Sequence, residues 1–331
     1  MPVSTWPRGH TEKLRFRRKA EAIPAMDEFE LIRRYFKRNS VADDVVTGIG
    51  DDGAVLVPNT TRQQIQVIDT LVEGVHFPHD TDPSDIAYRA VAVNLSDIAA
   101  MGARPRWMTL ALTLPNVDEQ WVESFAAGLF EAADEFDVAL VGGDTTAGLA
   151  VVVTVSITGD VRPGAALLRS GAEPGDGIYV TGTLGDAAAG LHLLQCGESN
   201  DVLVQRFLRP TARVETGAAL VGKATAAIDI SDGLAGDLRK LLAASGVGGE
   251  IQIDRLPMSD ALRKAASTEQ QNQWALCGGD DYELCFTAKE EAMTDTGGVT
   301  QIGRITQSAC LNFTLNGDVV EINDSGYRHF Q

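Results

Sequence analysis

Acidic side chains of this chain recur in glycine-rich turns beside short apolar segments. The first of these turns, residues 48–53, places Asp51 and Asp52 side by side between glycines. Glycine has no Cβ, so the backbone there can turn tightly or approach a ligand closely. Aspartate oxygens are hard ligands for Mg²⁺, which bridges to phosphate oxygens. By itself, the turn is equally consistent with a metal-mediated phosphate site and with an acidic surface turn.

Further acids share this setting, because each follows or ends a short apolar segment predicted as a strand: Asp69, Asp144, Asp229, Asp232, Asp280 and Asp281. Asp97 differs, since it lies three residues after Asn94 on the same face of an otherwise apolar helix. A buried carboxylate requires a partner, and either a metal ion or an arginine can provide one. A solvated surface position explains any single acid, but the sequence places no matching basic residues nearby. The whole set therefore favours metal binding.

Sequence matches to motifs of other enzyme classes are rejected, because the residues around them do not fit those motifs. Residues 48–53 match G-x-G-x-x-G, but that dinucleotide fingerprint continues into a helix, whereas residues 54–58 are predicted as a strand ended by proline. Residues 217–223 resemble a Walker A loop, yet Ala224 replaces the Ser/Thr that holds Mg²⁺, and the pattern there is helical. The H-E-x-x-H and G-x-S-x-G patterns do not occur. These observations exclude the common kinase and hydrolase frameworks.

Length and charge limit the class of protein. The 331 residues are enough for two domains of ordinary size. A net charge of -18 opposes nucleic acid and anionic lipid, which bind through positive patches. Four cysteines without a C-x-x-C pair fit a reducing compartment, and apolar runs such as residues 151–155 are too short to span a bilayer. We therefore expect a cytoplasmic protein without nucleic-acid or membrane partners.

Strands and helices alternate along the chain, which predicts α/β or α+β layers. The predicted strands are residues 64–69, 107–114, 138–141, 150–157, 177–181, 226–230 and 284–287. The predicted helices are residues 27–38, 82–101, 118–136, 185–194 and 231–244. Prolines and glycines between residues 160 and 174 indicate a domain boundary. We expect domains at residues 27–160 and 161–331, after a basic segment (residues 1–26) that is either disordered or upstream of the true start at Met26.

Six motifs occur in an order and spacing that resemble the thiamine-monophosphate kinases, within the aminoimidazole ribonucleotide synthetase-like superfamily. They occupy residues 48–56, 69–77, 92–103, 142–146, 229–234 and 278–284. The D-T-L-V-E-G-V-H-F segment at residues 69–77 points to this branch, and the resemblance extends from about residue 27 to the C-terminus. It implies a two-domain α/β (α+β) fold. The mixed-sheet N-terminal domain would bind metal and ATP and form a barrel within a homodimer, while an α/β C-terminal domain would complete the nucleotide and substrate site.

The resemblance also implies an activity, which is ATP-dependent phosphorylation of thiamine monophosphate to thiamine diphosphate. The transfer would be direct and in line, assisted by several Mg²⁺ ions, with no residue acting as a general base. The implied metal ligands are Asp52, Asp69, Asp97, Asp144, Asp229 and Asp232. The implied ATP contacts are Gly143, Asp144, Arg169 and Ser231, and the implied thiamine-monophosphate contacts are His76, Asp280 and Tyr327.

Two positions depart from the family pattern. Val67 and Ile68 stand where the family often has a Ser-Thr pair, so only backbone carbonyls remain there to approach a metal. Asp280 stands where the family has glutamate and is one methylene shorter. Two alternatives to the kinase stay open: an ATP-dependent enzyme of the same fold acting on another acceptor, and a non-catalytic protein that binds nucleotide or thiamine phosphate.

Overall fold

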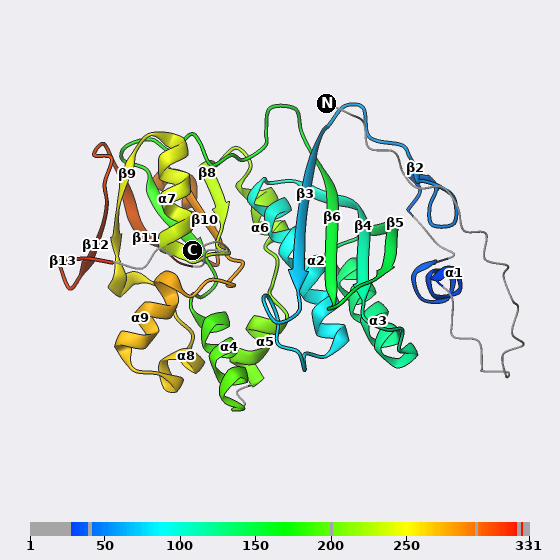
Figure 1. The fold of residues 1–331 in the computed structure, drawn as a ribbon. Coiled ribbons are helices and arrows are strands. Elements are labelled where there is room, and N and C mark those ends of the chain that lie inside the picture. The colour runs from blue at the N-terminus through cyan, green and yellow to red at the C-terminus, as the bar shows by residue number, and fades with distance from the viewer. Residues whose placement is uncertain (1–27, 39–41, 199–200, 295–296, 323–325, 327–331) are drawn as a thin grey trace, which may run out of the picture.

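The computed structural model describes residues 28–38, 42–198, 201–294, 297–322 and 326. The basic segment 1–26 and the predicted substrate contact Tyr327 lie outside these residues. Figure 1 shows two sheets side by side, with β3–β6 in one and β7–β13 in the other. The predicted α/β (α+β) fold class is confirmed. None of the helices in the described ranges combines the length and apolarity that crossing a bilayer requires.

The first sheet has the strand order β3-β6-β4-β5. Its strands are β3 (Gln63–Val72), β4 (Arg104–Leu114), β5 (Ala139–Ala147) and β6 (Val152–Val161). Along β6, buried Val153, Val155 and Ile157 alternate with half-buried residues, as expected when one face of a sheet packs on a core. The helix α2 (Pro83–Ala100) contacts this sheet and also α3 (Glu119–Glu135), so nearly all of its residues are buried.

Both of these helices begin where the sequence predicts. The side chain of Asp82 accepts a hydrogen bond from the backbone N–H of Ser84, and Pro83 takes the first helical position. Asp118 caps α3 in the same way through the backbone N–H of Gln120. These caps satisfy backbone donors that a helix leaves unpaired, and they fix where α2 enters the core.

The second sheet has the strand order β13-β12-β9-β11-β7-β10-β8 and is antiparallel except for the β12–β9 pair. Its strands are β7 (Gly177–Thr181), β8 (Ala224–Asp229), β9 (Gly248–Gln252), β10 (Leu284–Ala288), β11 (Val299–Thr306), β12 (Leu311–Leu315) and β13 (Asp318–Val320). The helices of this part are α4 (Asp186–Cys196), α5 (Asp201–Leu208), α6 (Val214–Leu220), α7 (Leu234–Ser245), α8 (Asp260–Ala265) and α9 (Thr268–Cys277). Two 3-10 turns, Ile253–Arg255 and Glu290–Met293, complete it. Helix α6 packs on α2 and joins the two parts.

The segment before the first sheet confirms one prediction and refines another. β1 (Val45–Thr47) pairs with β2 (Val55–Leu56), so a strand does follow the glycine-rich turn. The predicted helix 27–38 is present as a short α-helix, α1 (Glu28–Leu31), which continues as a π-helix over Ile32–Phe36. The Walker A look-alike lies mostly in helix α6, which supports its rejection.

Two predicted strand ends are wrong. Asp69 and Asp144 lie inside strands, because β3 continues to Val72 and β5 continues to Ala147. The reason is pairing with neighbours distant in sequence: Asp69 lies opposite Val155 of β6, and Asp144 lies opposite Ala111 of β4. Inter-strand hydrogen bonds keep both segments extended beyond the predicted strand ends.

Candidate active site

A cavity of about 780 Å³ lies between the two parts of the chain. β3, α2, the end of β8 and α7 provide acids, and α4 and the loops before β7 and before β10 also line the wall. The predicted residues that the structure brings together here are Asp69, His76, Asp97, Arg169, Asp229, Ser231, Asp232 and Asp280. Residues as far apart in the chain as Asp69 and Asp280 therefore lie around one cavity.

Three of these acids form a strongly negative group. Burial raises the pKa of Asp69 and of Asp97 to about 6, and that of Asp229 to about 7. Electrostatic repulsion raises these pKa values further, because the charge of Asp69 acts on Asp97 and the charge of Asp97 acts on Asp229. The Oγ of Ser96 donates to Oδ2 of Asp229 at 2.8 Å, and the charge of Arg169 opposes the shift only in part. A bound cation would relieve this repulsion.

The described residues contain no group of three or more His, Cys, Asp or Glu side chains close enough to hold a metal as they stand. That observation excludes a preformed cage built from protein alone. Mg²⁺ commonly keeps several waters and takes only one or two carboxylates together with substrate phosphates. The donor chemistry of the three repelling acids, spread along the cavity wall, fits that mode of binding.

Three other predicted residues lie elsewhere. Asp52, Gly143 and Asp144 line a separate pocket of about 460 Å³, next to the glycine-rich turn. Asp144 is on β5 and Asp69 is on β3, the opposite edges of the same sheet. A single copy of the chain therefore does not bring the whole predicted ligand set together.

Gly143 has a structural role that does not depend on a nucleotide. A Cβ at this position would meet the backbone carbonyl oxygen of Leu110 at 1.9 Å, closer than any real contact. The glycine is therefore required by the close approach of β5 to β4.

The expectation that the acids lack basic partners is wrong for two of them. The ammonium of Lys240 lies 2.6 Å from Oδ2 of Asp232 and 2.8 Å from Oδ1 of Asp237. The guanidinium of Arg89 donates to Oδ1 of Asp280 at 2.5 Å. The i, i+3 spacing of Asp237 and Lys240 is a local signal for the Lys240–Asp237 ion pair, which brings the ammonium to Asp232. No local signal exists for the Arg89–Asp280 pair, because 191 residues separate its partners.

Asp237 lines the cavity and is a candidate site residue that sequence reasoning missed. Its side chain is 1% exposed, and its Oδ2 accepts hydrogen bonds of 2.9 Å from the backbone N–H groups of both Ser231 and Asp232. Burial raises its pKa, which the neighbouring Lys240 opposes. Asp237 thereby holds the turn that presents Ser231 and Asp232 to the cavity.

The side chains of the loop before β10 alternate between two environments. Asp280 and Tyr282 line the cavity, whereas Asp281 and Glu283 are buried in a network behind it. Both carboxylate oxygens of Asp281 accept from the backbone N–H of Gly185, at 2.9 and 3.0 Å. Burial raises the pKa of Asp281 well above its usual range.

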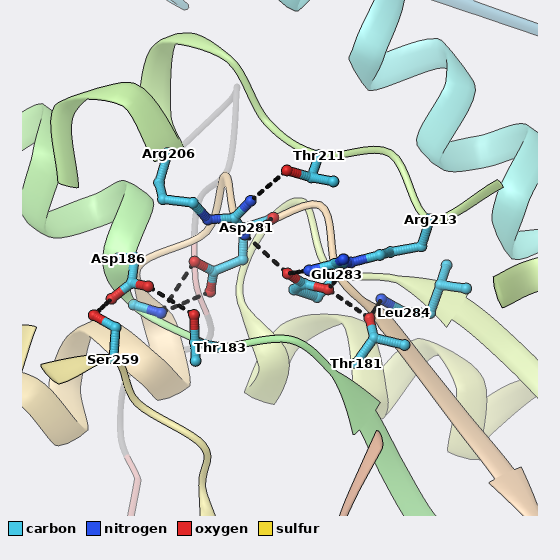
Figure 2. A network of polar contacts seen from close by, with 11 residues as sticks. Thr181, Thr183, Asp186, Arg206, Thr211, Arg213, Ser259, Asp281, Glu283 and Leu284 are labelled. Carbon is cyan, nitrogen blue, oxygen red and sulfur yellow. Dashed lines mark hydrogen bonds and ion pairs between the residues drawn. The ribbon is translucent and has the colours of Figure 1, made fainter. Parts of the chain in front are cut away.

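Glu283 forms the centre of the network in Figure 2 and accepts from Arg206, Arg213 and Thr181. Asp280 and Tyr282 have φ angles of 61° and 50°, a left-handed conformation that is uncommon for residues other than glycine. Such a backbone persists only when its surroundings hold it in place. The buried network supplies that constraint and fixes the residues that face the cavity.

The structure also shows the surroundings of His76, Val67 and Ile68, which the sequence analysis singled out. The Nδ1 atom of His76 accepts a hydrogen bond from the backbone N–H of Val72 at 3.0 Å, which holds the ring at the cavity wall. Val67 packs against the core, and its carbonyl oxygen accepts from the Oγ of Ser156. Ile68 is 65% exposed on the uncovered face of the sheet. Neither side chain contributes an oxygen to the cavity.

Comparison with known proteins agrees with this architecture. Residues 50–161 match the model for the N-terminal domain of AIR synthase related proteins, and residues 173–315 match the model for its C-terminal domain. The thiamine-monophosphate kinase of Escherichia coli (strain K12) is 50% identical over 324 residues, covering 92% of this chain and 99% of the relative. That of Bacillus subtilis (strain 168) is 36% identical over 330 residues, covering 92% and 100%.

Solved structures give the same result. The thiamine-monophosphate kinase from Stenotrophomonas maltophilia K279a superposes with a TM-score of 0.79 at 45% identity, covering 84% of this chain and 93% of that one. The structure of AaThiL complexed with AMPPCP and TMP superposes with a TM-score of 0.76 at 34% identity, covering 85% and 92%. The two matched domains and the identities over nearly the full length place this chain in the thiamine-monophosphate kinase family, and four of the six motifs meet at one cavity.

Proposed function

We propose that this protein transfers the γ-phosphoryl group of ATP to thiamine monophosphate and releases thiamine diphosphate and ADP. The observation that carries the proposal is the single cavity in which the three repelling acids meet His76, Arg169 and Asp280. Relatives named thiamine-monophosphate kinase support the substrate, as does AaThiL bound to TMP and to AMPPCP, an ATP analogue. We also propose a cytoplasmic location and a division of the chain near residue 161.

The chemistry requires two anions to be brought together. When bound, Mg²⁺ ions screen the β- and γ-phosphates and the acceptor phosphate. The residues that would hold them in this cavity are Asp69, Asp97, Asp229 and Asp232. Arg169 would add a fixed positive charge and Ser231 a polar contact on the nucleotide side, while His76 and Asp280, together with Tyr327, would hold thiamine monophosphate.

No residue needs to act as a general base. The attacking oxygen belongs to a phosphate monoester, whose second pKa of about 6 leaves it ionised near neutral pH. Alignment of the two phosphates and neutralisation of their charge are then the main catalytic contributions, which suits direct in-line transfer. The side chains of this cavity are of the kinds that such a reaction uses.

We infer that two copies of the chain complete the site. The four-stranded sheet has two free edges, β3 and β5, and its uncovered face carries side chains that bond one another, such as Thr70 with Thr154. Free edges tend to pair, and joining β3 of each copy to β5 of the other would close a ring with no free edge. Asp144 and Asp52 of one copy would then approach Asp69 of the other.

This arrangement predicts complementation between inactive variants. Asp97→Asn and Asp144→Ala are each expected to be inactive, and two differently tagged variants can be co-expressed and purified through both tags. Under two-fold symmetry one site of such a heterodimer carries both changes and the other carries neither, so about half of the wild-type activity is expected. An inactive heterodimer, or a monomer by light scattering, would refute the shared site.

The activity itself is tested by measuring ADP release from MgATP with thiamine monophosphate, thiamine or aminoimidazole precursors, with the product mass checked. We expect turnover only with the monophosphate and a product of the mass of thiamine diphosphate. Turnover with another acceptor would instead support a different enzyme of the same fold. Tight nucleotide binding without any product would support a non-catalytic binding protein.

A further inference from the structure

Arg89 is a buried cation that links the two parts of the chain at the cavity. It lies on α2, and its side chain is 2% exposed. Its Nη1 donates to the carbonyl oxygen of Phe207, and its Nη2 donates to Oδ1 of Asp280 at 2.5 Å. Its guanidinium lies 4.3 Å from the ring centroid of Phe207 and 5.5 Å from that of Tyr282. A buried charge is costly unless it is paired, and Asp280 supplies its carboxylate partner.

These contacts determine how Asp280 is presented. Oδ1 accepts from Arg89 and, at 3.3 Å, from the hydroxyl of Tyr282. Within the described ranges, Oδ2 has no hydrogen-bond partner, and the side chain, 29% exposed, lines the cavity. One carboxylate oxygen is therefore held by the protein, and the other is left for a ligand.

We propose that Arg89 is a positioning residue that sets the reach of Asp280 towards the acceptor and thereby the affinity for thiamine monophosphate; this inference rests on the proposed function. Asp280 is one methylene shorter than the glutamate of the family pattern. Buried Arg89 holds one carboxylate oxygen of Asp280 in a fixed place. This restricts the orientation of the Asp280 side chain and thereby compensates for its shorter length.

Arg89 also ties this acid to the metal-binding side of the cavity. Asp97 follows it by eight residues on α2, which is a rise of about 12 Å at 1.5 Å per residue and a turn of about 80° around the helix axis. Helix α2 thus carries both Asp97 and the group that holds Asp280. The acceptor and the transferred phosphate are aligned through one rigid element, and alignment is a large part of the catalytic effect.

Arginine and lysine are not equivalent at this position. The planar guanidinium bonds a carbonyl and a carboxylate at the same time, whereas the ammonium of lysine is a shorter-reaching point charge. Arg89→Lys keeps the charge but withdraws the donor from Asp280. Asp280→Glu adds one methylene, which extends the carboxylate towards the shorter side chain that Arg89→Lys introduces. The two changes are expected to compensate for each other.

The test is a cycle of four proteins: wild type, Arg89→Lys, Asp280→Glu and the double variant. We expect each single change to raise KM for thiamine monophosphate about tenfold or more, since small misplacements are costly. The double variant is expected within about threefold of wild type. KM for ATP is expected to be unchanged in all four. Arg209→Lys is the matched control. Like Arg89, Arg209 forms an ion pair, in its case with Asp85 of α2 at 2.5 Å, but it is not among the residues that line the cavity. Arg209→Lys is expected to leave both KM values unchanged.

The outcomes separate this inference from the proposed function. If wild type makes thiamine diphosphate but the two single effects simply multiply in the double variant, the inference is wrong and the function stands. The same holds if Arg89→Lys lowers only the melting temperature and leaves KM for thiamine monophosphate unchanged. If wild type makes no thiamine diphosphate, the proposed function is wrong and the inference is lost with it.

Discussion

Asp97→Asn is expected to lower kcat by about 10³-fold or more while raising the melting temperature of the metal-free protein. A metal ion at a phosphoryl-transfer site contributes several kcal/mol of charge stabilisation, and each ~1.4 kcal/mol is worth about tenfold in rate. In the metal-free protein, Asp97 and Asp69 repel one another, as do Asp97 and Asp229. Removing the charge of Asp97 relieves both repulsions. The measurements are steady-state turnover and thermal unfolding in a chelating buffer.

The stability gain is expected to depend on pH. The pKa of Asp97 is about 6 in the folded protein, against 3.8 for the ordinary group. Between these values the folded state holds a proton that the unfolded state has released, so stability falls as pH rises through the interval. Asp97→Asn therefore stabilises the protein above about pH 6 and loses this advantage towards pH 4.

The exposed Asp318→Asn is the control for this prediction and is expected to change neither turnover nor stability. An Asp97→Asn variant with near-wild-type turnover would remove Asp97 from the metal site. A variant that is equally stabilised at pH 4 and pH 7 would show that the cost of the Asp97 charge, from burial and from repulsion by its neighbours, is not the cause.

Glu283→Gln is expected to reduce the free energy of unfolding by about 3 kcal/mol, because it removes the centre of a buried ion network. The Glu283 side chain is fully buried and bonds Arg206 at 2.9 Å and Arg213 at 2.6 Å. Arg206 and Arg213 are 17% and 29% exposed, so water offsets part of the loss, and the estimate of about 3 kcal/mol is the lower end of the range for breaking a buried pair. At about 2–4 °C per kcal/mol, the melting temperature is expected to fall by roughly 6–12 °C.

Glu119→Gln provides a matched control for this change. Glu119 pairs with Arg34 at 3.2 Å, but both side chains are more than half exposed, so an effect below about 1 kcal/mol is expected. Loosening of the loop that carries Asp280 is expected to raise KM for thiamine monophosphate even below the melting transition. A melting temperature equal to that of wild type would show that the network does not stabilise the fold.

Sequence patterns alone predicted the four strands of the first sheet, helices α2 and α3 and the order of the motifs, but they did not predict β9 or β11–β13 of the second sheet. Caps such as Asp82 and Asp118 are local, because a side chain bonds a backbone group two residues away. The ends of β3 and β5 were less predictable, since they depend on strands paired from elsewhere in the chain. The local sequence pattern therefore predicted which acids line the cavity more accurately than it predicted the ends of the strands that carry them.

Which acids lie together, and which are paired with a cation, depends on contacts between elements that are distant in the chain. The tertiary structure placed Asp144 in a pocket apart from Asp69, and it paired Asp280 with Arg89 from a helix 191 residues away. Neither result has a local signature, because sequence spacing records neighbours along one element and not contacts between elements. Burial sets both the repulsion among the acids and the need of Arg89 for a partner. It is a property of packing that arises only when the two parts of the chain come together.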